Sequence, residues 1–278
     1  MITERGKCMI SSIKQIPKHA LLILLCAFAI FPLYWMVISS LKPLGEIFTP
    51  SMFPSAPTLE NYTYAVNNVP IFRLTLNTLI IASVQTVAQL VSAVMAAYAL
   101  TRWEFKGRGL IFTIFSLTWL VPMQAIMIPN YITITSLGLR NTMLGVILPF
   151  TASTFAILSL YSALKSFPKA LIEAAVMDKL SEFSILTRIV LPNIKPAMVS
   201  LGILLFIHGW NEYLWAMLVN TRIDQAPIQI GLQQFLSLER NEWGALMAAA
   251  TLSSIPIIAL YLALQKMIIN SFVKWGIK

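Results

Sequence analysis

Long uninterrupted apolar stretches dominate the chain, and six of them reach the length of a membrane span. A span needs about 20 mostly apolar residues. Backbone polar groups inside a bilayer must be paired within their own segment, so each stretch is predicted to be a helix. We therefore expect an all-α membrane protein with six transmembrane helices. The stretches cover residues 20–38, 74–100, 110–129, 143–164, 198–219 and 245–264.

The segments between these stretches are too short to hold a second domain. We expect one transmembrane domain over 20–270, with short tails at 1–19 and 271–278. Prolines at five positions of the first connection, 39–73, predict an ordered cap rather than a domain. The most highly charged connection, 165–195, is expected on the opposite side of the membrane.

Composition and charge agree with this pattern. Hydrophobic residues make up 58% of the 278 and charged residues only 11%, against about 25% charged in soluble domains. Of the 20 Lys and Arg, 15 flank the spans on the N-terminal side and 5 on the other. This bias predicts a plasma (inner) membrane protein with both termini in the cytoplasm. The net charge of +9 is explained in this way, and nucleic-acid binding is not expected.

Motifs for common enzymatic chemistry are missing. The sequence contains no Gly-x-x-x-x-Gly-Lys-Ser/Thr loop for nucleotide phosphates, no His-Glu-x-x-His and no Gly-x-Ser-x-Gly. The two histidines, His19 and His208, lack carboxylate companions at metal-ligand spacing. We expect no catalytic site, no metal and no cofactor.

A few polar residues interrupt the spans. Such residues either form hydrogen bonds between helices or line a wet path through the membrane. Glu212 is also close enough to the end of its stretch to be reached by water or headgroups. The candidates for a translocation path are Gln85, Gln89, Asn211, Glu212 and Tyr213.

Connection 165–195 predicts two short helices. Ser166 is suited to capping the first helix, and Pro168 suits its first turn. Asp178 is expected to cap the second helix, which should end at Leu191–Pro192. A face of small residues would let another surface approach the first helix closely. That face holds Ala170, Leu171, Ala174 and Ala175.

This connection resembles the EAA loop of binding-protein-dependent ABC transporter permeases, and the chain is similar to their maltose-type carbohydrate subfamily. Further matching stretches, in the same order, extend the resemblance over nearly the whole chain. The matching residues are Glu173-Ala174-Ala175, Asp178, Ile189, Leu191 and Pro192 in the loop, and Leu137-Gly138-Leu139, Asn141-Thr142, Leu148-Pro149, Trp210 to Trp215, Gly231-Leu232, Trp243-Gly244, Pro256 and Gln265 elsewhere. The family usually has Gly where Lys179 stands, and often an acid where Ala170 stands.

The resemblance implies a type I ABC importer permease fold whose short loop helix, 168–177, couples to an ATPase. It implies a homologous second permease, two cytoplasmic ATP-binding subunits and an extracytoplasmic solute-binding protein. ATP hydrolysis is then expected on a separate subunit. The coupling residues implied in this chain are Pro168, Leu171, Glu173, Ala174, Ala175 and Asp178.

We therefore expect the permease subunit of an ATP-driven importer that translocates a sugar, an oligosaccharide or a polyol. Two alternatives stay open at this point. One is a permease of the same fold for another small solute. The other is a secondary carrier or channel that acts alone.

Overall fold

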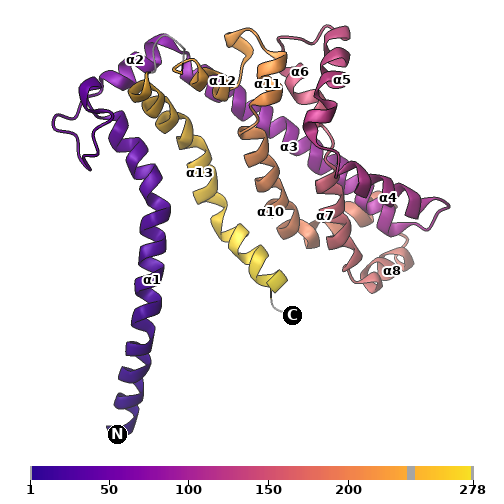
Figure 1. The fold of residues 1–278 in the computed structure, drawn as a ribbon. Helices are drawn as coiled ribbons and strands as arrows, with labels where there is room; N and C mark the ends of the chain where they lie inside the picture. The colour runs from indigo at the N-terminus through magenta and orange to yellow at the C-terminus, as the bar shows by residue number, and fades with distance from the viewer. Residues whose placement is uncertain (1, 237–241, 277–278) are drawn as a thin grey trace. The chain divides into compact units, whose positions relative to one another are not determined.

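The computed structural model describes residues 2–236 and 242–276. Every regular element of these ranges is a helix (Figure 1). This confirms the expected all-α class. The described chain divides into two compact units, and the last helix, α13 (Trp243–Gly276), contributes to both.

The first unit comprises Met1–Val69 and Phe235–Leu252. It contains α1 (Ile2–Ser40), the 3-10 helix η1 (Leu44–Glu46), α2 (Glu60–Asn68) and the start of α13. The expected tail at 1–19 continues the first helix, because α1 begins at Ile2.

The connection after α1 is folded onto the end of that helix, as its prolines suggest. Lys42 is completely buried; its Nζ donates a hydrogen bond to the Thr49 carbonyl at 2.9 Å and lies 4.5 Å from the centre of the Trp35 ring. The Asn61 amide donates to the Ser40 and Lys42 carbonyls at 3.0 and 2.8 Å. The lysine charge is thus stabilised by a carbonyl and by an aromatic face.

The second unit comprises Pro70–Gln234 and Ser253–Lys278. Its long central helix α3 contacts α7, α10 and α12 (Figure 1). The elements of this unit before α13 are α3 (Ile71–Arg102), α4 (Arg108–Thr118), α5 (Met123–Ser136), α6 (Met143–Ile147), η2 (Leu148–Phe150), α7 (Thr154–Lys165), α8 (Lys169–Met177), α9 (Glu182–Ser184), the π-helix η3 (Ile185–Val190), α10 (Leu191–Trp210), α11 (Leu214–Val219), η4 (Ile223–Gln225) and α12 (Ile228–Gln233).

Four helical segments of the described chain are long and apolar enough to cross a membrane, and two bent helix pairs bring the number to six if each pair is one span. Three of the four agree with the sequence prediction within a few residues. The four segments are Pro17–Ser40, Ile71–Arg102, Glu182–Trp210 and Trp243–Lys266.

The stretch expected as one span over 110–129 is broken. Helices α4 and α5 meet at an angle of 98°, and Pro122 begins the second of them. Proline lacks an N–H and disfavours helical backbone in the residue before it, so the hydrogen-bond ladder stops here. The stretch over 143–164 bends by 43°, where Ser153 caps α7 by accepting a hydrogen bond from the Ala156 N–H at 3.3 Å.

The fifth span was also misplaced by the sequence prediction. The helix does not stop at Leu191–Pro192 but continues through them to Trp210, and 211–213 separate it from α11. The π-helix η3 lies immediately before Pro192. Such wider turns accommodate the carbonyl groups that a proline leaves without a partner.

Candidate coupling helix and membrane cavity

Helix α8 begins at Lys169, with Pro168 at its N-cap position. The prediction that Ser166 caps this helix is wrong. Its hydroxyl donates to the Ala163 carbonyl at 2.8 Å, so it belongs to the end of α7. Pro168 itself is well suited to the start of a helix, because its φ of −63° is already helical and its missing N–H would have no partner there.

Helix α8 ends in a Schellman motif. Lys179 has φ of +56°; its N–H donates to the Val176 carbonyl at 2.9 Å, and the Leu180 N–H donates to the Ala175 carbonyl at 3.1 Å. The turn therefore needs a left-handed residue, which costs a non-glycine residue about 1–2 kcal/mol. The family pattern that the sequence resembles has Gly where Lys179 stands, and glycine adopts this conformation without that cost.

Asp178 ends α8 and does not cap the second helix, so that prediction is corrected. Ser181 takes the role instead, because its hydroxyl accepts a hydrogen bond from the Ser184 N–H at 3.3 Å. Asp178 contributes its backbone N–H, which donates to the Ala174 carbonyl at 3.0 Å.

The residues expected on one docking face of α8 lie on two sides of it. Ala175 is only 3% exposed and belongs to the same hydrophobic core as Ile185 and Val190. Leu171 and Met177 are 45% and 83% exposed, and Glu173 and Ala174 are exposed as well. Ala175 therefore anchors the helix to its own chain, and the open surface is formed by the other residues.

A clamp of three residues, Tyr98, Arg102 and Glu182, joins the short helix α9 to the end of α3. The Glu182 carboxylate accepts hydrogen bonds from Arg102 Nη2 at 2.7 Å, from Arg102 Nε at 3.2 Å and from the Tyr98 hydroxyl at 2.9 Å. Two-pronged arginine–carboxylate pairs are the strongest and most directional of their kind. The sequence analysis missed the clamp, since about 80 residues separate the partners and nothing local links them.

In the membrane-spanning part, a cavity of about 300 Å³ brings together three of the five predicted path residues. Gln85, Gln89 and Glu212 line it. Asn211 and Tyr213 do not: the Asn211 amide donates to the Ile207 carbonyl at 2.9 Å, and the Tyr213 hydroxyl donates to Met217 Sδ at 2.8 Å.

The two glutamines form hydrogen bonds between helical elements and also line the cavity. Gln85 Nε2 donates to the Val146 carbonyl at 3.0 Å, and Gln89 Nε2 donates to the Phe150 carbonyl at 2.7 Å. They tie α3 to the bent pair α6–η2 and α7 while also lining the cavity. Glu212 Oε1 accepts a hydrogen bond from the Trp215 N–H at 3.0 Å, which stabilises the start of α11.

Trp119 and His208 are among the lining residues that the sequence did not predict for this path. Trp119 lines it from the break between α4 and α5, and His208 lines it from the last turn of α10. His208 is exposed, and its ring makes no hydrogen bond within the described residues. The sequence did offer a signal for Trp119, because this residue lies three positions before Pro122, where a proline can interrupt an apolar helix.

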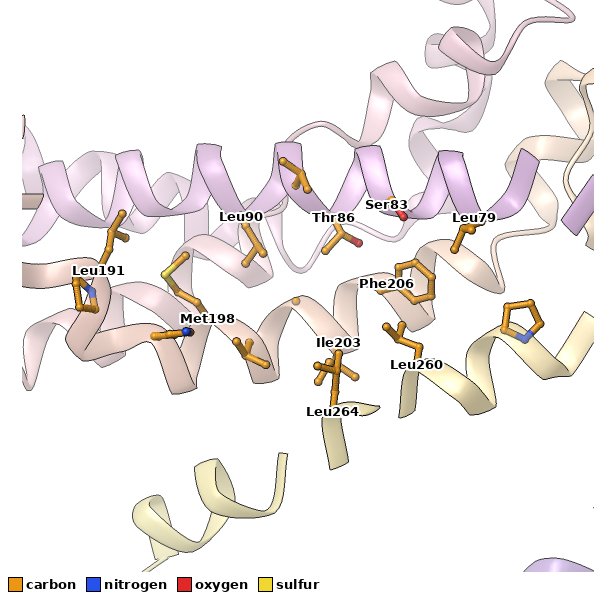
Figure 2. A pocket seen from close by; sticks show the side chains of 16 residues that line it. Leu79, Ser83, Thr86, Leu90, Leu191, Met198, Ile203, Phe206, Leu260 and Leu264 are labelled. Atoms are coloured by element: carbon orange, nitrogen blue, oxygen red, sulfur yellow. The ribbon is translucent and has the colours of Figure 1, made fainter. Parts of the chain in front are cut away.

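A larger groove of about 960 Å³ runs between α3, α10 and α13. In Figure 2, Leu79, Thr86 and Leu90 face Ile203 and Phe206 across it. Its lining is almost wholly apolar, with few groups that could hydrogen-bond a polar solute. The smaller cavity, with its mixture of aromatic and polar side chains, is therefore the better candidate for solute contact.

Comparisons with known proteins agree on one family. Residues 89–274 match the family described as "Binding-protein-dependent transport system inner membrane component". The chain is 30% identical to the arabinooligosaccharides transport system permease protein AraQ of Bacillus subtilis, over 96% of this chain and 97% of that protein. It is 31% identical to the diacetylchitobiose uptake system permease protein NgcG of Streptomyces coelicolor, over 91% of this chain and 85% of that one.

The fold is shared with a solved structure, that of a bacterial ABC transporter involved in the import of the acidic polysaccharide alginate. The TM-score is 0.79 at 24% identity, over 92% of this chain and 96% of that one. The type I importer permease fold expected from the sequence is thereby confirmed. The chain belongs to the family of inner membrane components of binding-protein-dependent transport systems, as a multi-pass permease subunit of an ABC importer.

Proposed function

We propose that this chain forms part of the pathway by which an ATP-driven importer carries a sugar, an oligosaccharide or a polyol across the plasma membrane. The proposal includes a second, homologous permease subunit, two cytoplasmic ATP-binding subunits and an extracytoplasmic solute-binding protein. The names of the relatives that transport arabinooligosaccharides and diacetylchitobiose support the substrate class. ATP hydrolysis lies on the separate subunits, because this sequence has no phosphate-binding loop.

The observation that carries the coupling role is the two-sided character of α8. Ala175 packs into the chain's own core, while Leu171 and Met177 stay largely exposed. Exposed apolar side chains gathered on a short helix mark a surface for another protein. This helix lies on the side that the Lys and Arg bias assigns to the cytoplasm, together with both termini.

A rigid attachment is the second requirement for coupling. Movement of α8 can reach the membrane helices only if the intervening residues do not yield. The Schellman turn at Lys179 fixes the exit from α8, and the Glu182 clamp holds the next element to α3. In this proposal Pro168, Leu171, Glu173 and Ala174 contact the ATPase or set the start of the helix. Ala175 and Asp178 stabilise the helix through contacts within this chain: Ala175 packs in the hydrophobic core, and the Asp178 N–H donates to the Ala174 carbonyl.

The translocation path is proposed to pass the cavity lined by Gln85, Gln89 and Glu212. Asn211 and Tyr213 lie beside it and would contribute through the shape of the break between α10 and α11. An importer of another small solute on the same fold is the second candidate, favoured by a relative in Rhizobium meliloti, 30% identical over 92% of this chain, whose name specifies transport of sn-glycerol-3-phosphate. Membership of an ABC permease family disfavours a carrier or channel acting alone.

Two substitutions on the open side of α8 test the coupling role in the complete transporter. Glu173→Lys reverses an exposed charge, and Ala174→Trp adds bulk where a partner would pack. Both should reduce uptake and co-purification of the ATPase at least fivefold while leaving membrane insertion intact, since neither touches a span. Overfilling a close contact costs about 1–3 kcal/mol.

Lys106→Glu is the matched control, because it changes an exposed charge on the same side of the membrane outside α8. It should keep wild-type uptake. Wild-type uptake and ATPase association in both α8 variants would show that this helix is not the coupling element. Uptake of no sugar or polyol by the wild-type transporter would refute the substrate class.

A further inference from the structure

The cavity lies where the helical structure of the membrane-spanning part is interrupted. Gln85 and Gln89 sit at the middle of the 32-residue helix α3. Around them, the breaks before α5, before α7 and before α11 each contribute a lining residue: Trp119, Ser153 and Glu212. Irregular backbone at membrane depth is tolerated only where it is buried in protein or lines a watery cavity. Three breaks at one level therefore favour a solute site.

The polar atoms around the cavity are only partly used within the chain. One N–H of the Gln85 amide and one of the Gln89 amide are bonded to carbonyls, which leaves each Oε1 as an acceptor and each second N–H as a donor. One Glu212 oxygen holds the Trp215 N–H, and the other has no partner among the described residues. The His208 ring can both donate and accept. The unused groups thus include both acceptors and donors, as suits a ligand rich in hydroxyl groups, which can donate and accept.

Aromatic side chains also line the cavity. The rings of Trp119 and Phe155 lie 6.1 Å apart at an angle of 31°, and Phe150 lines the cavity beside them. A sugar ring presents C–H groups on its faces and hydroxyl groups around its rim. It can therefore place a face against an aromatic side chain while its hydroxyls bond to polar side chains of the same cavity.

The size and charge of the cavity limit the class of ligand further. A volume of about 300 Å³ is at the lower limit of small-molecule sites and is enough for one sugar ring. Glu212 brings the cavity a negative charge, and none of the described residues that line it is a lysine or an arginine. A phosphorylated or acidic sugar would meet a like charge at close range.

From these observations we infer that this subunit itself contacts the solute, and that the cavity holds one ring of a neutral sugar or polyol during passage. Gln85, Gln89 and Glu212 accept hydrogen bonds from its hydroxyls, His208 makes one further bond, and Trp119 packs on a face of the ring. The inference rests on the proposed function, since it requires a carbohydrate as cargo.

The test uses the complete transporter with its binding protein in proteoliposomes. Uptake of radiolabelled arabinotriose and of diacetylchitobiose is measured beside ATP hydrolysis stimulated by the binding protein. Trp119→Ala and His208→Ala should each slow uptake about tenfold and leave stimulated hydrolysis within twofold. The matched controls are Leu120→Ala, from the same break but outside the cavity, and His19→Ala; both should transport normally.

A second measurement does not depend on any variant folding. A diazirine derivative of the transported sugar is photolysed during turnover, and the labelled peptides are mapped. Adducts at Trp119 or within 204–212 support the site. Wild-type uptake by both cavity variants, or labelling confined to other subunits, overturns the site while the proposed function stands. Failure of the wild-type transporter to take up either sugar, while it takes up an anionic solute, overturns both.

Discussion

Breaking the clamp between Glu182 and Arg102 should loosen the coupling loop by a measurable amount. The change is Glu182→Gln, which keeps the shape of the side chain and removes its charge. The Arg102 and Glu182 side chains are 24% and 42% exposed, so the burial of this ion pair is intermediate between that of a fully exposed pair and that of a fully buried pair. Exposed ion pairs contribute about 0–1 kcal/mol, and truncating one partner of a buried pair costs about 2–5 kcal/mol.

Three hydrogen bonds converge on this carboxylate, one of them from Tyr98. Bonds to charged groups contribute about 1.5–3 kcal/mol when well buried, and partial exposure reduces this. We expect a loss of about 1–2 kcal/mol in the free energy of local opening, which corresponds to a 5- to 30-fold change in the opening equilibrium. Amide hydrogen exchange over 182–190 in the assembled transporter should accelerate by that factor.

A double-mutant cycle separates the pair from its surroundings. Arg102→Gln alone should have a similar effect, and the two changes together should add little beyond either one. Asp224→Asn breaks a separate ion pair, Arg222–Asp224, and should leave exchange over 182–190 unchanged. Acceleration of less than twofold in Glu182→Gln would refute the reasoning that this clamp holds the loop.

Three further predictions concern backbone strain and pH. Lys179→Gly should slow exchange of the Leu180 amide about two- to fivefold, because glycine relieves the strain at φ +56° at a smaller entropic cost; faster exchange would contradict this. Asn141→Gly relieves a similar φ of +62° but should lower the melting temperature, since Asn141 Oδ1 accepts hydrogen bonds from the Thr221 N–H and hydroxyl; an unchanged value would contradict it. Hydrogen bonds from the Ser55 hydroxyl and N–H lower the pKa of Glu46 below its usual 4.5. The stabilisation is thus present above pH 4.5 and lost as the pH falls through that lowered pKa, so proteolysis over 46–55 should rise in acid, with Ser55→Ala shifting the onset to higher pH.

Apolar length predicted the unbroken spans well, because their ends coincide with charged residues that the membrane excludes. Proline was a poor guide to the breaks. Pro32 and Pro256 lie inside continuous helices, whereas Pro122 begins a helix after a 98° bend. Whether a proline bends, breaks or leaves a membrane helix intact depends on which neighbours satisfy the freed carbonyls, and those neighbours are distant in sequence.

The residues of the candidate site were likewise predicted only in part from the sequence. The i,i+4 spacing placed Gln85 and Gln89 on one face, and the structure brings both to the cavity. The position of Glu212 depends on where α10 ends, and this could not be predicted from a uniformly apolar stretch. In α8, the periodicity could not tell that the chain's own core covers Ala175, because the covering residues Ile185 and Val190 come from the following turn.

The π-helix over Ile185–Val190 sets the rotational phase between the coupling loop and the membrane cavity. It is continuous with α9 before it and α10 after it, and a π-turn holds one residue more than an α-turn. Each residue of an α-helix advances the side chains by about 100°. One residue added to a plain α-helix would therefore rotate every residue after it by about that angle, whereas a π-turn takes up the additional residue within a single turn. The chain can thus hold one additional residue at this point while the face of α10 that lines the cavity keeps its angle relative to the clamp between Glu182 and Arg102.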